Sequence, residues 1–349
     1  MPDDPMNPPP RQPSRVARGA DALELSIALS ENENTRAILD GRIAPDAIKL
    51  YPTALHPSEM FWRQLKFAEF DVSEMSMSSL TIATSHGPTP WVAIPVFTTR
   101  EFFHNRILVR VASGIERPAD LKGKRVGVPE YQQTAAIWGR GVLQHEFGVH
   151  PRDIEWHMER TPETSHGGST GFKAPDGVTV RQIPLSTNIG EMMVKGELDA
   201  TLLYLTHANL VDRSRIDLNG DSRFRPLFDR KAEARRYFAK TGIYQINHTV
   251  VMRRSLYEQH PWIALNLFKA FAAAKAEVRQ QGEQFLRNYF ITGLLGGEAR
   301  DALANDPMAY GVNSTRKVLE TIAQYVHEQG LTSRRVGLEE LFAPSTMGL

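Results

Sequence analysis

The sequence contains no cysteine. This absence excludes a disulfide-stapled scaffold, a thiol nucleophile and any zinc or iron–sulfur centre held by thiolates. A large excess of charge of one sign is also missing, because 41 lysines and arginines face 40 aspartates and glutamates. A net charge of +1 gives no reason to expect nucleic acid or an acidic membrane surface as the main partner.

Long apolar runs are missing as well. No stretch approaches the roughly 20 apolar residues of a membrane helix, so we expect no membrane partner. The first twenty residues are rich in proline and charge, and they lack the apolar run of roughly 7–15 residues that a secretory signal requires. We therefore expect residues 1–20 to be a disordered tail and the protein to be cytoplasmic.

The rest of the chain has the pattern of an α/β protein. The chain of 349 residues is long enough for one large or two ordinary domains, and its 41% of hydrophobic residues is typical of a globular protein. Predicted helices begin near residues 35, 57, 76, 130, 189 and 261, and residues 160–177 are predicted as a loop. Apolar alternation and short apolar runs predict strands at 23–29, 48–51, 70–75, 91–97, 106–110, 124–128, 199–204 and 245–252. Strands and helices that alternate in this way predict mostly parallel sheets.

Several catalytic signatures are absent or fail in context. There is no phosphate-binding glycine motif, so no nucleotide is expected. Residues 167–171 fit G-x-S-x-G, but a nucleophile elbow needs a strand before it and a helix after it, and both flanks are predicted as loop. His145, His150, His157 and His166 lack the spacing of zinc ligands, and we interpret them as surface residues. We expect no metal.

Six segments carry a resemblance to a known family. They are DGRIAPDAIKL (40–50), MFWRQLKFAEFDVSEMSMSS (60–79), VAIPVFTTREFFHNRILV (92–109), ADLKGKRVGVPEYQQTAAIWGRGVLQHEFGV (119–149), TGIYQINHTVVMRRSLYEQHPWIA (241–264) and LEELFAP (338–344). Together they resemble the 4,5-dihydroxyphthalate decarboxylases over about residues 23–344. The phrase DLKGKRVGVPE is less specific, because many periplasmic solute-binding proteins carry something like it.

The resemblance implies a type II periplasmic-binding-protein-like fold, with a substrate-binding cleft between two α/β lobes. We expect lobe one to span residues 21–110 and 245–349, and lobe two to span 111–244. Ligands of such folds bind where strand ends and helix N-termini of both lobes meet.

Three predicted cleft segments offer groups that bind anions. Arg36 follows the first strand, three serines follow the third, and the first helix of lobe two begins beside polar residues. Backbone N–H groups and hydroxyls at such positions bind carboxylates, although the same residues also serve as ordinary helix caps. The candidates beside Arg36 are Ser76, Ser78, Ser79, Tyr131, Gln132 and Thr134.

A basic and aromatic group precedes the expected crossover between the lobes. Arg100, His104 and Arg106 alternate with phenylalanines, which suits an aromatic dicarboxylate, and Tyr244 lies just before the returning strand. The alternative is a hinge loop with solvated charges. Glu74 shares the inward face of its strand with Val72, and an inward carboxylate must be paired or functional. We expect an arginine as its partner.

The resemblance implies a carboxy-lyase of phthalate degradation, a form of aromatic compound catabolism, that turns 4,5-dihydroxyphthalate or a close aromatic diacid into protocatechuate and carbon dioxide. No cofactor is expected. A phenolate para to the departing carboxylate sends electron density to that ring carbon, and a general acid protonates it. We predict His104 as the acid, His248 as the second choice, and water held by Glu74 as the alternative. Arg36 or Arg100 is expected to hold the carboxylate that stays.

A solute-binding protein of an importer, holding a small aromatic or other organic anion, remains the alternative because fold does not decide function. A secretory signal in front of the chain would favour it. A homo-oligomer is compatible with the sequence.

Overall fold

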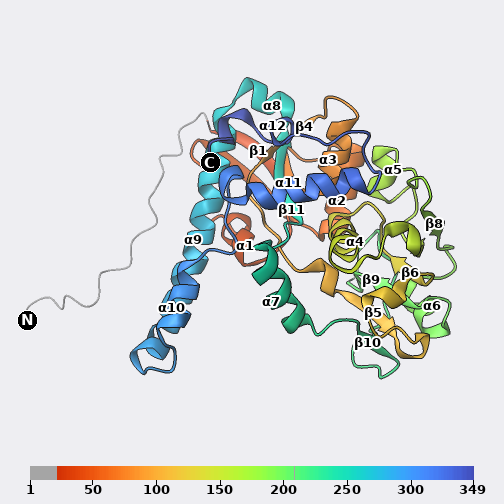
Figure 1. Ribbon diagram of the computed structural model, residues 1–349. Coiled ribbons are helices and arrows are strands. Elements are labelled where there is room, and N and C mark those ends of the chain that lie inside the picture. The colour runs from red at the N-terminus through yellow and green to blue at the C-terminus, as the bar shows by residue number, and fades with distance from the viewer. Residues whose placement is uncertain (1–21, 208) are drawn as a thin grey trace, which may run out of the picture.

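The computed structural model describes residues 22–207 and 209–349. The tail expected at residues 1–20 lies outside these ranges. Two β-sheets, each flanked by helices, form two lobes that lie side by side (Figure 1). This arrangement confirms the α/β class and the two-lobed architecture.

The sheet of lobe one has the strand order β2-β1-β3-β11-β4. Strands β1 and β2, and β1 and β3, are parallel, whereas β11 is antiparallel to both of its neighbours. The returning strand therefore inserts between two strands formed early in the chain. The bounds are β1 Leu23–Leu29, β2 Ile48–Ala54, β3 Val72–Ser76, β4 Trp91–Ile94 and β11 His248–Arg253.

The sheet of lobe two has the order β10-β5-β9-β6-β7-β8. Strands β9, β6, β7 and β8 are parallel, and β5 is antiparallel to β9 and β10. Both sheets are more mixed than predicted because the strands at the crossovers, β5 and β11, run against their neighbours. The bounds are β5 Ile107–Arg110, β6 Arg125–Val128, β7 Glu155–Met158, β8 Thr179–Gln182, β9 Ala200–Leu202 and β10 Phe224–Pro226.

The first lobe boundary needs correction. Residues 107–110 form β5, which belongs to the sheet of lobe two, so the chain crosses before residue 107 and not after residue 110. The apolar pattern of residues 107–110 is compatible with either sheet, so the sequence alone did not show that this strand belongs to lobe two. The return near residue 245 agrees with β11.

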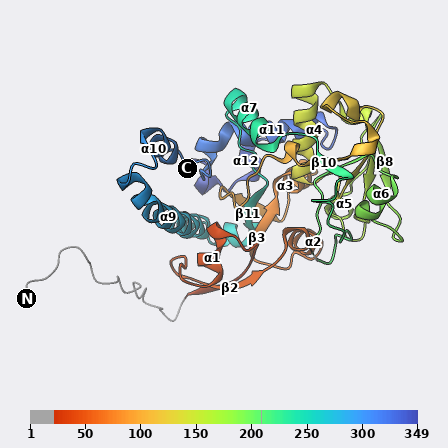
Figure 2. The same ribbon diagram turned by 90° about the horizontal axis from the view of Figure 1, so that it is seen from below.

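Helices cover both faces of each sheet (Figure 2). In lobe one they are α1 Glu33–Leu39, α2 Pro57–Phe67, α3 Met77–Ser85, α8 Arg254–Gln259, α9 Trp262–Ile291, α10 Gly297–Ala304, α11 Val312–Glu328 and α12 Leu338–Leu341. In lobe two they are α4 Thr134–Phe147, α5 His166–Thr170, α6 Ile189–Lys195 and α7 Arg230–Thr241. Over the described ranges, no helix combines the length and apolar character needed to cross a bilayer.

One hydrophobic core spans both lobes. It contains residues of α3, α4 and α11, and α11 packs on both of the other helices. The indole of Trp138 in α4 donates a 2.8 Å hydrogen bond to the carbonyl of Ile246, just before β11. The two lobes are therefore joined by packed side chains at one end of the seam between them.

The contact of α4 with α11 depends on Gly141. A Cβ added there would overlap the ring of Tyr325 on α11. We expect Gly141→Ala to destabilise the protein by about 1–3 kcal/mol in urea denaturation, because overpacking a well-filled core forces side chains and backbone to shift. Arg316→Ala, on the exposed face of α11, is the control and should change stability by less than about 0.5 kcal/mol. Equal stability of Gly141→Ala and the parent would contradict this account of the helix contact.

Candidate active site at the seam between the lobes

Helices α3 of lobe one and α4 of lobe two begin at the same place on the seam. Ser76 and Thr134 are hydrogen-bonded through their hydroxyls at 2.8 Å. The backbone N–H of Ser78 donates to the hydroxyl of Thr134 at 3.0 Å, and the hydroxyl of Ser78 donates to the carbonyl of Gln132 at 2.6 Å. The structure thus brings together the serine run and the α4 residues that the sequence assigned to opposite sides of a cleft.

The charge distribution at this junction favours an anion. The N-terminus of a helix carries partial positive charge, and here two N-termini converge. Among the described residues, neither N-cap side chain, that of Ser76 or that of Gln133, bonds to the first turn of its own helix. The side-chain amide nitrogens of Gln132 and Gln133 are buried without a partner. Donors in excess of acceptors suit a carboxylate.

Glu74 of β3 is fully buried beside the junction. Its Oε1 accepts hydrogen bonds from the backbone N–H and the hydroxyl of Ser30, at 2.7 and 2.6 Å. Its Oε2 accepts from the hydroxyl of Thr98 at 2.7 Å and lies 3.0 Å from Nδ1 of His248. Burial alone would raise the pKa of Glu74, but the hydrogen bonds from His248, Ser30 and Thr98 hold this pKa below its ordinary value. The carboxyl group is therefore ionised.

The expectation that an arginine pairs with Glu74 is wrong. The partner is His248, because β11 lies beside β3 in a register that places His248, the first residue of β11, opposite Ser76, the last residue of β3. Nε2 of the ring lies 2.9 Å from the side-chain amide of Asn247, and the edge of the ring contacts Phe61 with 4.6 Å between ring centroids. An –NH₂ group can only donate, so Nε2 of His248 accepts from Asn247, and the ring N–H at Nδ1 donates to Glu74.

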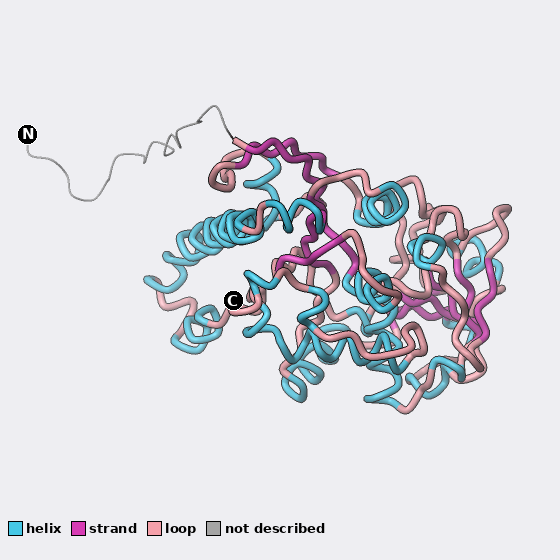
Figure 3. The backbone as a smooth tube through the Cα atoms, turned by 90° about the horizontal axis from the view of Figure 1, so that it is seen from above, coloured by secondary structure: helices cyan, strands magenta, loops and turns pink. Residues whose placement is uncertain are grey.

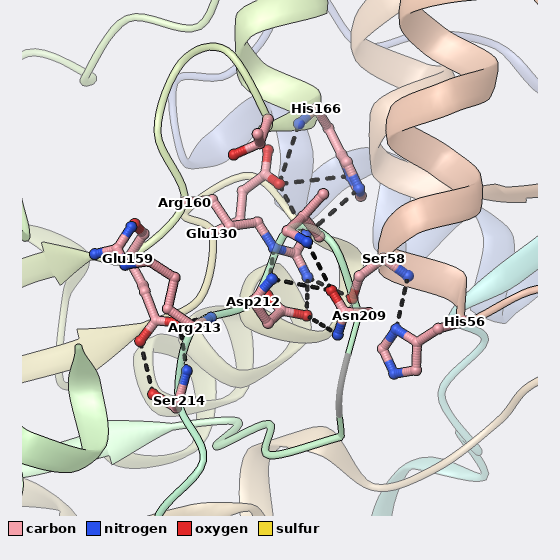
Figure 4. A network of polar contacts seen from close by, with 12 residues as sticks. His56, Ser58, Glu130, Glu159, Arg160, His166, Asn209, Asp212, Arg213 and Ser214 are labelled. Atoms are coloured by element: carbon pink, nitrogen blue, oxygen red, sulfur yellow. Dashed lines mark hydrogen bonds and ion pairs between the residues drawn. The ribbon is translucent and has the colours of Figure 1, made fainter. Parts of the chain in front are cut away.

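Arg160 is buried on the lobe-two side and lies at the centre of the network in Figure 4. Its guanidinium donates to both carboxylate oxygens of Asp212, at 2.7 and 3.1 Å, and to Glu130 at 3.0 Å. It also donates to the hydroxyl of Ser58, on α2 of lobe one, at 2.5 Å. Burial opposes the charged form, yet the two carboxylates raise the pKa of Arg160 above its ordinary value. One cation shared by two carboxylates leaves a net negative charge.

His166 extends this network to lobe one. Its Nδ1 lies 3.1 Å from the hydroxyl of Ser79, and its Nε2 lies 3.5 Å from the guanidinium of Arg160. Burial lowers the pKa of His166 to about 4, so the ring is neutral near pH 7. The ring packs edge-on against Phe61 with 5.6 Å between centroids, and Phe61 therefore contacts the imidazoles of both His166 and His248.

The interpretation of His166 as a surface residue is wrong. Part of the segment predicted as loop folds into α5, whose first turn is capped by the hydroxyl of Ser165. The backbone N–H groups of His166 and Gly167 donate to Glu130, at 3.1 and 2.8 Å. These bonds hold the ring of His166 in the seam. The polar and small residues of the segment 160–177 do not predict them.

Two more histidines lie near this network. Nδ1 of His56 accepts a hydrogen bond from the backbone of Ser58 at 3.3 Å, and the rings of His56 and His207 are 6.2 Å apart. Burial lowers the pKa of His56. In the two described ranges of the chain, no cluster of acidic or histidine side chains is arranged to hold a metal ion.

The structure places His104 in a different buried cluster. Its Nε2 lies 3.0 Å from Glu233 of α7, and its Nδ1 lies 3.1 Å from the side-chain amide of Gln245. Both ring nitrogens are therefore engaged at the two crossovers between the lobes. None of the described hydrogen bonds links His104 to Glu74 or His248, so its predicted role as acid stays a prediction without support from this geometry.

The remaining predicted residues also lie outside the hydrogen-bonded seam as described. Arg100 is buried, donates to the carbonyl of Ala309, and has its pKa lowered to about 10 by burial. Arg106 pairs with Glu101, and the hydroxyl of Tyr244 donates to the carbonyl of Arg100. Their predicted roles in binding substrate stay predictions.

Arg36 and Tyr131 complete this set. The side chain of Arg36 is 60% exposed and lies 3.7 Å from Glu31, as expected for a solvated helix face. Tyr131 is buried in the core of lobe two, where the guanidinium of Arg140 lies 3.7 Å from the centre of its ring.

Comparison with known proteins gives both full-length and partial relatives. No family model matches the chain. A 4,5-dihydroxyphthalate decarboxylase of Comamonas testosteroni is 32% identical over 329 residues, which is 93% of this chain and 98% of that protein. A protein of the same name from Pseudomonas putida is 38% identical over 180 residues, or 52% of this chain and 70% of that protein.

The solved structures that resemble the chain confirm the fold. The periplasmic aliphatic sulphonate binding protein SsuA of Escherichia coli aligns with a TM-score of 0.53 and 15% identity, over 94% of this chain and 99% of that one. The alkanesulfonate-binding protein SsuA of Xanthomonas axonopodis pv. citri, bound to MOPS, aligns with a TM-score of 0.54 and 16% identity over the same shares. At such low identity the likeness concerns the fold alone.

The neutral, buried state of His166 predicts a pH dependence of stability. Its pKa is about 4 in the folded chain and 6.5 as the ordinary value, so only the unfolded chain binds this proton between these pH values. Stability therefore falls as pH falls from 6.5 to 4, by roughly 3 kcal/mol from this group. Over this pH range we expect the free energy of unfolding of His166→Asn to fall by roughly 3 kcal/mol less than that of the parent. Denaturation series at stepped pH measure both values.

His86→Asn is the matched control, because His86 is exposed and takes part in none of the described side-chain hydrogen bonds or ion pairs. It should show the pH dependence of the parent. Parallel curves for the parent and His166→Asn would contradict the neutral buried state of His166.

Proposed function

The chain belongs to the 4,5-dihydroxyphthalate decarboxylase family, and from this membership we propose that it converts 4,5-dihydroxyphthalate into protocatechuate and carbon dioxide. The relative from Comamonas testosteroni matches along 93% of the chain, so both lobes belong to the shared unit. The structural observation that supports the proposal is the buried Glu74–His248 pair, which adjoins the junction of two helix N-termini.

The reaction breaks one bond and forms one. A phenolate para to one carboxylate sends electron density to the ring carbon that carries it, and a proton forms the new C–H bond at that carbon. The bond between this carbon and the carboxylate then breaks, its electron pair restores the aromatic ring, and carbon dioxide leaves. The protein must therefore hold the other carboxylate, exclude water and deliver one proton.

We assign the carboxylate that stays to the junction of α3 and α4. The hydroxyls of Ser76, Ser78 and Thr134 bond to one another across the closed seam. When the lobes separate, these hydroxyls and the nearby backbone N–H groups lose their mutual partners and can bind an anion. Two helix N-termini bind a carboxylate without an arginine, which agrees with the exposed position of Arg36.

We assign the departing carboxylate to the side of the seam near Arg160. This guanidinium is already shared by Asp212 and Glu130, so it offers no free charge to clamp a substrate carboxylate. An arginine held on the departing group would stabilise the ground state and slow the reaction. A net negative network acts in the opposite sense, because it disfavours the carboxylate relative to neutral carbon dioxide.

We assign proton delivery to His248 and not to His104. Of the two imidazoles that contact Phe61, His166 is neutral because its pKa is about 4. His248 is held through Nδ1 by the ionised carboxylate of Glu74, which fixes the orientation of the ring. Glu74 acts through His248 and is a positioning residue.

The test is to incubate the purified protein with 4,5-dihydroxyphthalate and measure protocatechuate by chromatography. If His248 delivers the proton, His248→Gln should lower kcat by about 10²–10⁴-fold and change KM only a few-fold. Glu74→Gln should also lower kcat, by a smaller factor, because it keeps the shape of the side chain and removes the charge that holds the ring of His248 in place.

His104→Gln run beside these variants separates the two assignments. Loss of turnover in His104→Gln, with full activity in His248→Gln, would show that His104 delivers the proton and that His248 does not. Binding of 4,5-dihydroxyphthalate with no turnover by the parent would instead favour the solute-binding alternative.

A further inference from the structure

Arg100 is a buried cation without a carboxylate partner in the described part of the chain. It is 9% exposed, and none of the ion pairs within 4 Å among the described residues includes it. Its Nη2 donates to the carbonyl of Ala309, and its Nε is buried without a partner. Buried charges are normally paired and buried donors are normally bonded, so this guanidinium has an unused charge and an unused N–H group.

Tyr310 supplies a second unused donor beside Arg100. It lies between α10 and α11, in a segment that Figure 3 draws in pink where the chain returns from α10 to lobe one. This segment is fixed on both sides of Tyr310, because the carbonyl of Ala309 accepts from Arg100 and the N–H of Gly311 donates to the carbonyl of Pro95 at 2.8 Å. The hydroxyl of Tyr310 is buried and has no hydrogen-bond partner among residues 22–207 and 209–349.

The segment that carries Arg100 is bonded to the Glu74–His248 pair. Two residues before Arg100, the hydroxyl of Thr98 donates to Glu74 at 2.7 Å. Arg100 itself forms a β-bridge with Ile246, two residues before His248. The unpaired guanidinium therefore belongs to the same end of the lobe-one sheet as the pair.

The charges of both Glu74 and Arg100 act on the phenol of Tyr310. Burial is the largest cause that raises the pKa of Tyr310, the charge of Glu74 raises it further, and the charge of Arg100 opposes them. The phenol is therefore protonated near pH 7 and can donate. A guanidinium N–H and a phenol O–H that both lack an acceptor suit an oxygen that carries negative charge.

The strand order shows where this oxygen would lie relative to the other assigned groups. In the order β3-β11-β4, Ser76 lies on one side of His248, and the segment after β4 that carries Arg100 lies on the other. Arg160 also lies on the β3 side, because its partner Ser58 belongs to α2, which packs on β3. Both substrate carboxylates are thus assigned to the β3 side. In 4,5-dihydroxyphthalate the two hydroxyls lie at the opposite edge of the ring, which corresponds to the side of Arg100.

We propose, on the basis of the function proposed above, that Arg100 and Tyr310 bind the phenolic oxygen para to the departing carboxylate. The substrate binds as its phenolate, and the phenol proton has gone to water. The oxygen loses negative charge when the ring carbon is protonated. It regains this charge when the bond to carbon dioxide breaks, because the electron pair of that bond restores both the ring and the phenolate. Donors placed at this oxygen stabilise the charge as it returns.

The other buried arginines do not fit this role. Among the described residues three arginines are buried, and they are Arg100, Arg140 and Arg160. Arg160 is shared by two carboxylates. Arg140 lies in the core of lobe two, over the ring of Tyr131. Arg100 is therefore assigned to the hydroxyl edge of the substrate and not to the carboxylate that stays.

The first test uses two ligands that are not turned over. Protocatechuate carries one carboxylate and two hydroxyls, whereas benzoate carries the carboxylate alone. In calorimetric titration the parent should bind protocatechuate at least about 10²-fold more tightly than benzoate, because a site built to bond a hydroxyl leaves its donors unpaired with the analogue that lacks it. Arg100→Gln and Tyr310→Phe should each reduce this ratio by about tenfold or more, with little change in the affinity for benzoate.

Tyr310→Phe separates binding from folding. The lost hydroxyl bonds to nothing in the described chain, so the urea midpoint of this variant should equal that of the parent. Tyr289→Phe is the control, because Tyr289 is 42% exposed on α9, and it should keep the affinity ratio of the parent. An unchanged ratio in Tyr310→Phe or in a folded Arg100→Gln overturns the proposal. If Arg100→Gln does not fold, Tyr310→Phe decides alone.

Turnover of 4,5-dihydroxyphthalate distinguishes this inference from the proposed function. In an active parent, Tyr310→Phe should lower kcat by about 10²-fold and change KM less, as expected for loss of one donor to a developing oxyanion. If the parent forms no protocatechuate but binds it with an affinity that Tyr310→Phe loses, the proposed function fails and the hydroxyl-binding site stands. If the parent is active and Tyr310→Phe keeps its kcat and its affinity ratio, this inference fails and the proposed function stands.

Discussion

The ionised carboxylate of Glu74, buried in the middle of a sheet, is the constraint on which the site depends. An unpaired carboxylate in that position costs several kcal/mol, so hydrogen-bond donors must reach it from elsewhere in the fold. They come from the end of β1, from the segment after β4 and from β11, at Ser30, Thr98 and His248. The strand order, with β3 between β1 and β11, therefore brings these donors to Glu74.

The crossing of the chain between lobes follows from the same requirement. His248 reaches Glu74 because the chain leaves lobe one after β4, builds lobe two and returns as β11 between β3 and β4. Lobe two then contributes Thr134, Arg160 and His166 across the seam, each bonded to a side chain of lobe one. These three bonds cross the seam, whereas the bond between Glu74 and His248 lies within lobe one and does not depend on lobe two.

The sequence predicted features that depend on local pattern and missed those that depend on strand order. The serines at the start of α3 and the residues at the start of α4 are visible as polar groups after apolar strands, and they meet in the structure. His104 and His248 both lie beside apolar strand residues, and only the insertion of β11 beside β3 shows which of them meets Glu74. The partners of Arg160 are distant along the chain, since Asp212 is 52 residues away, and no spacing rule connects them.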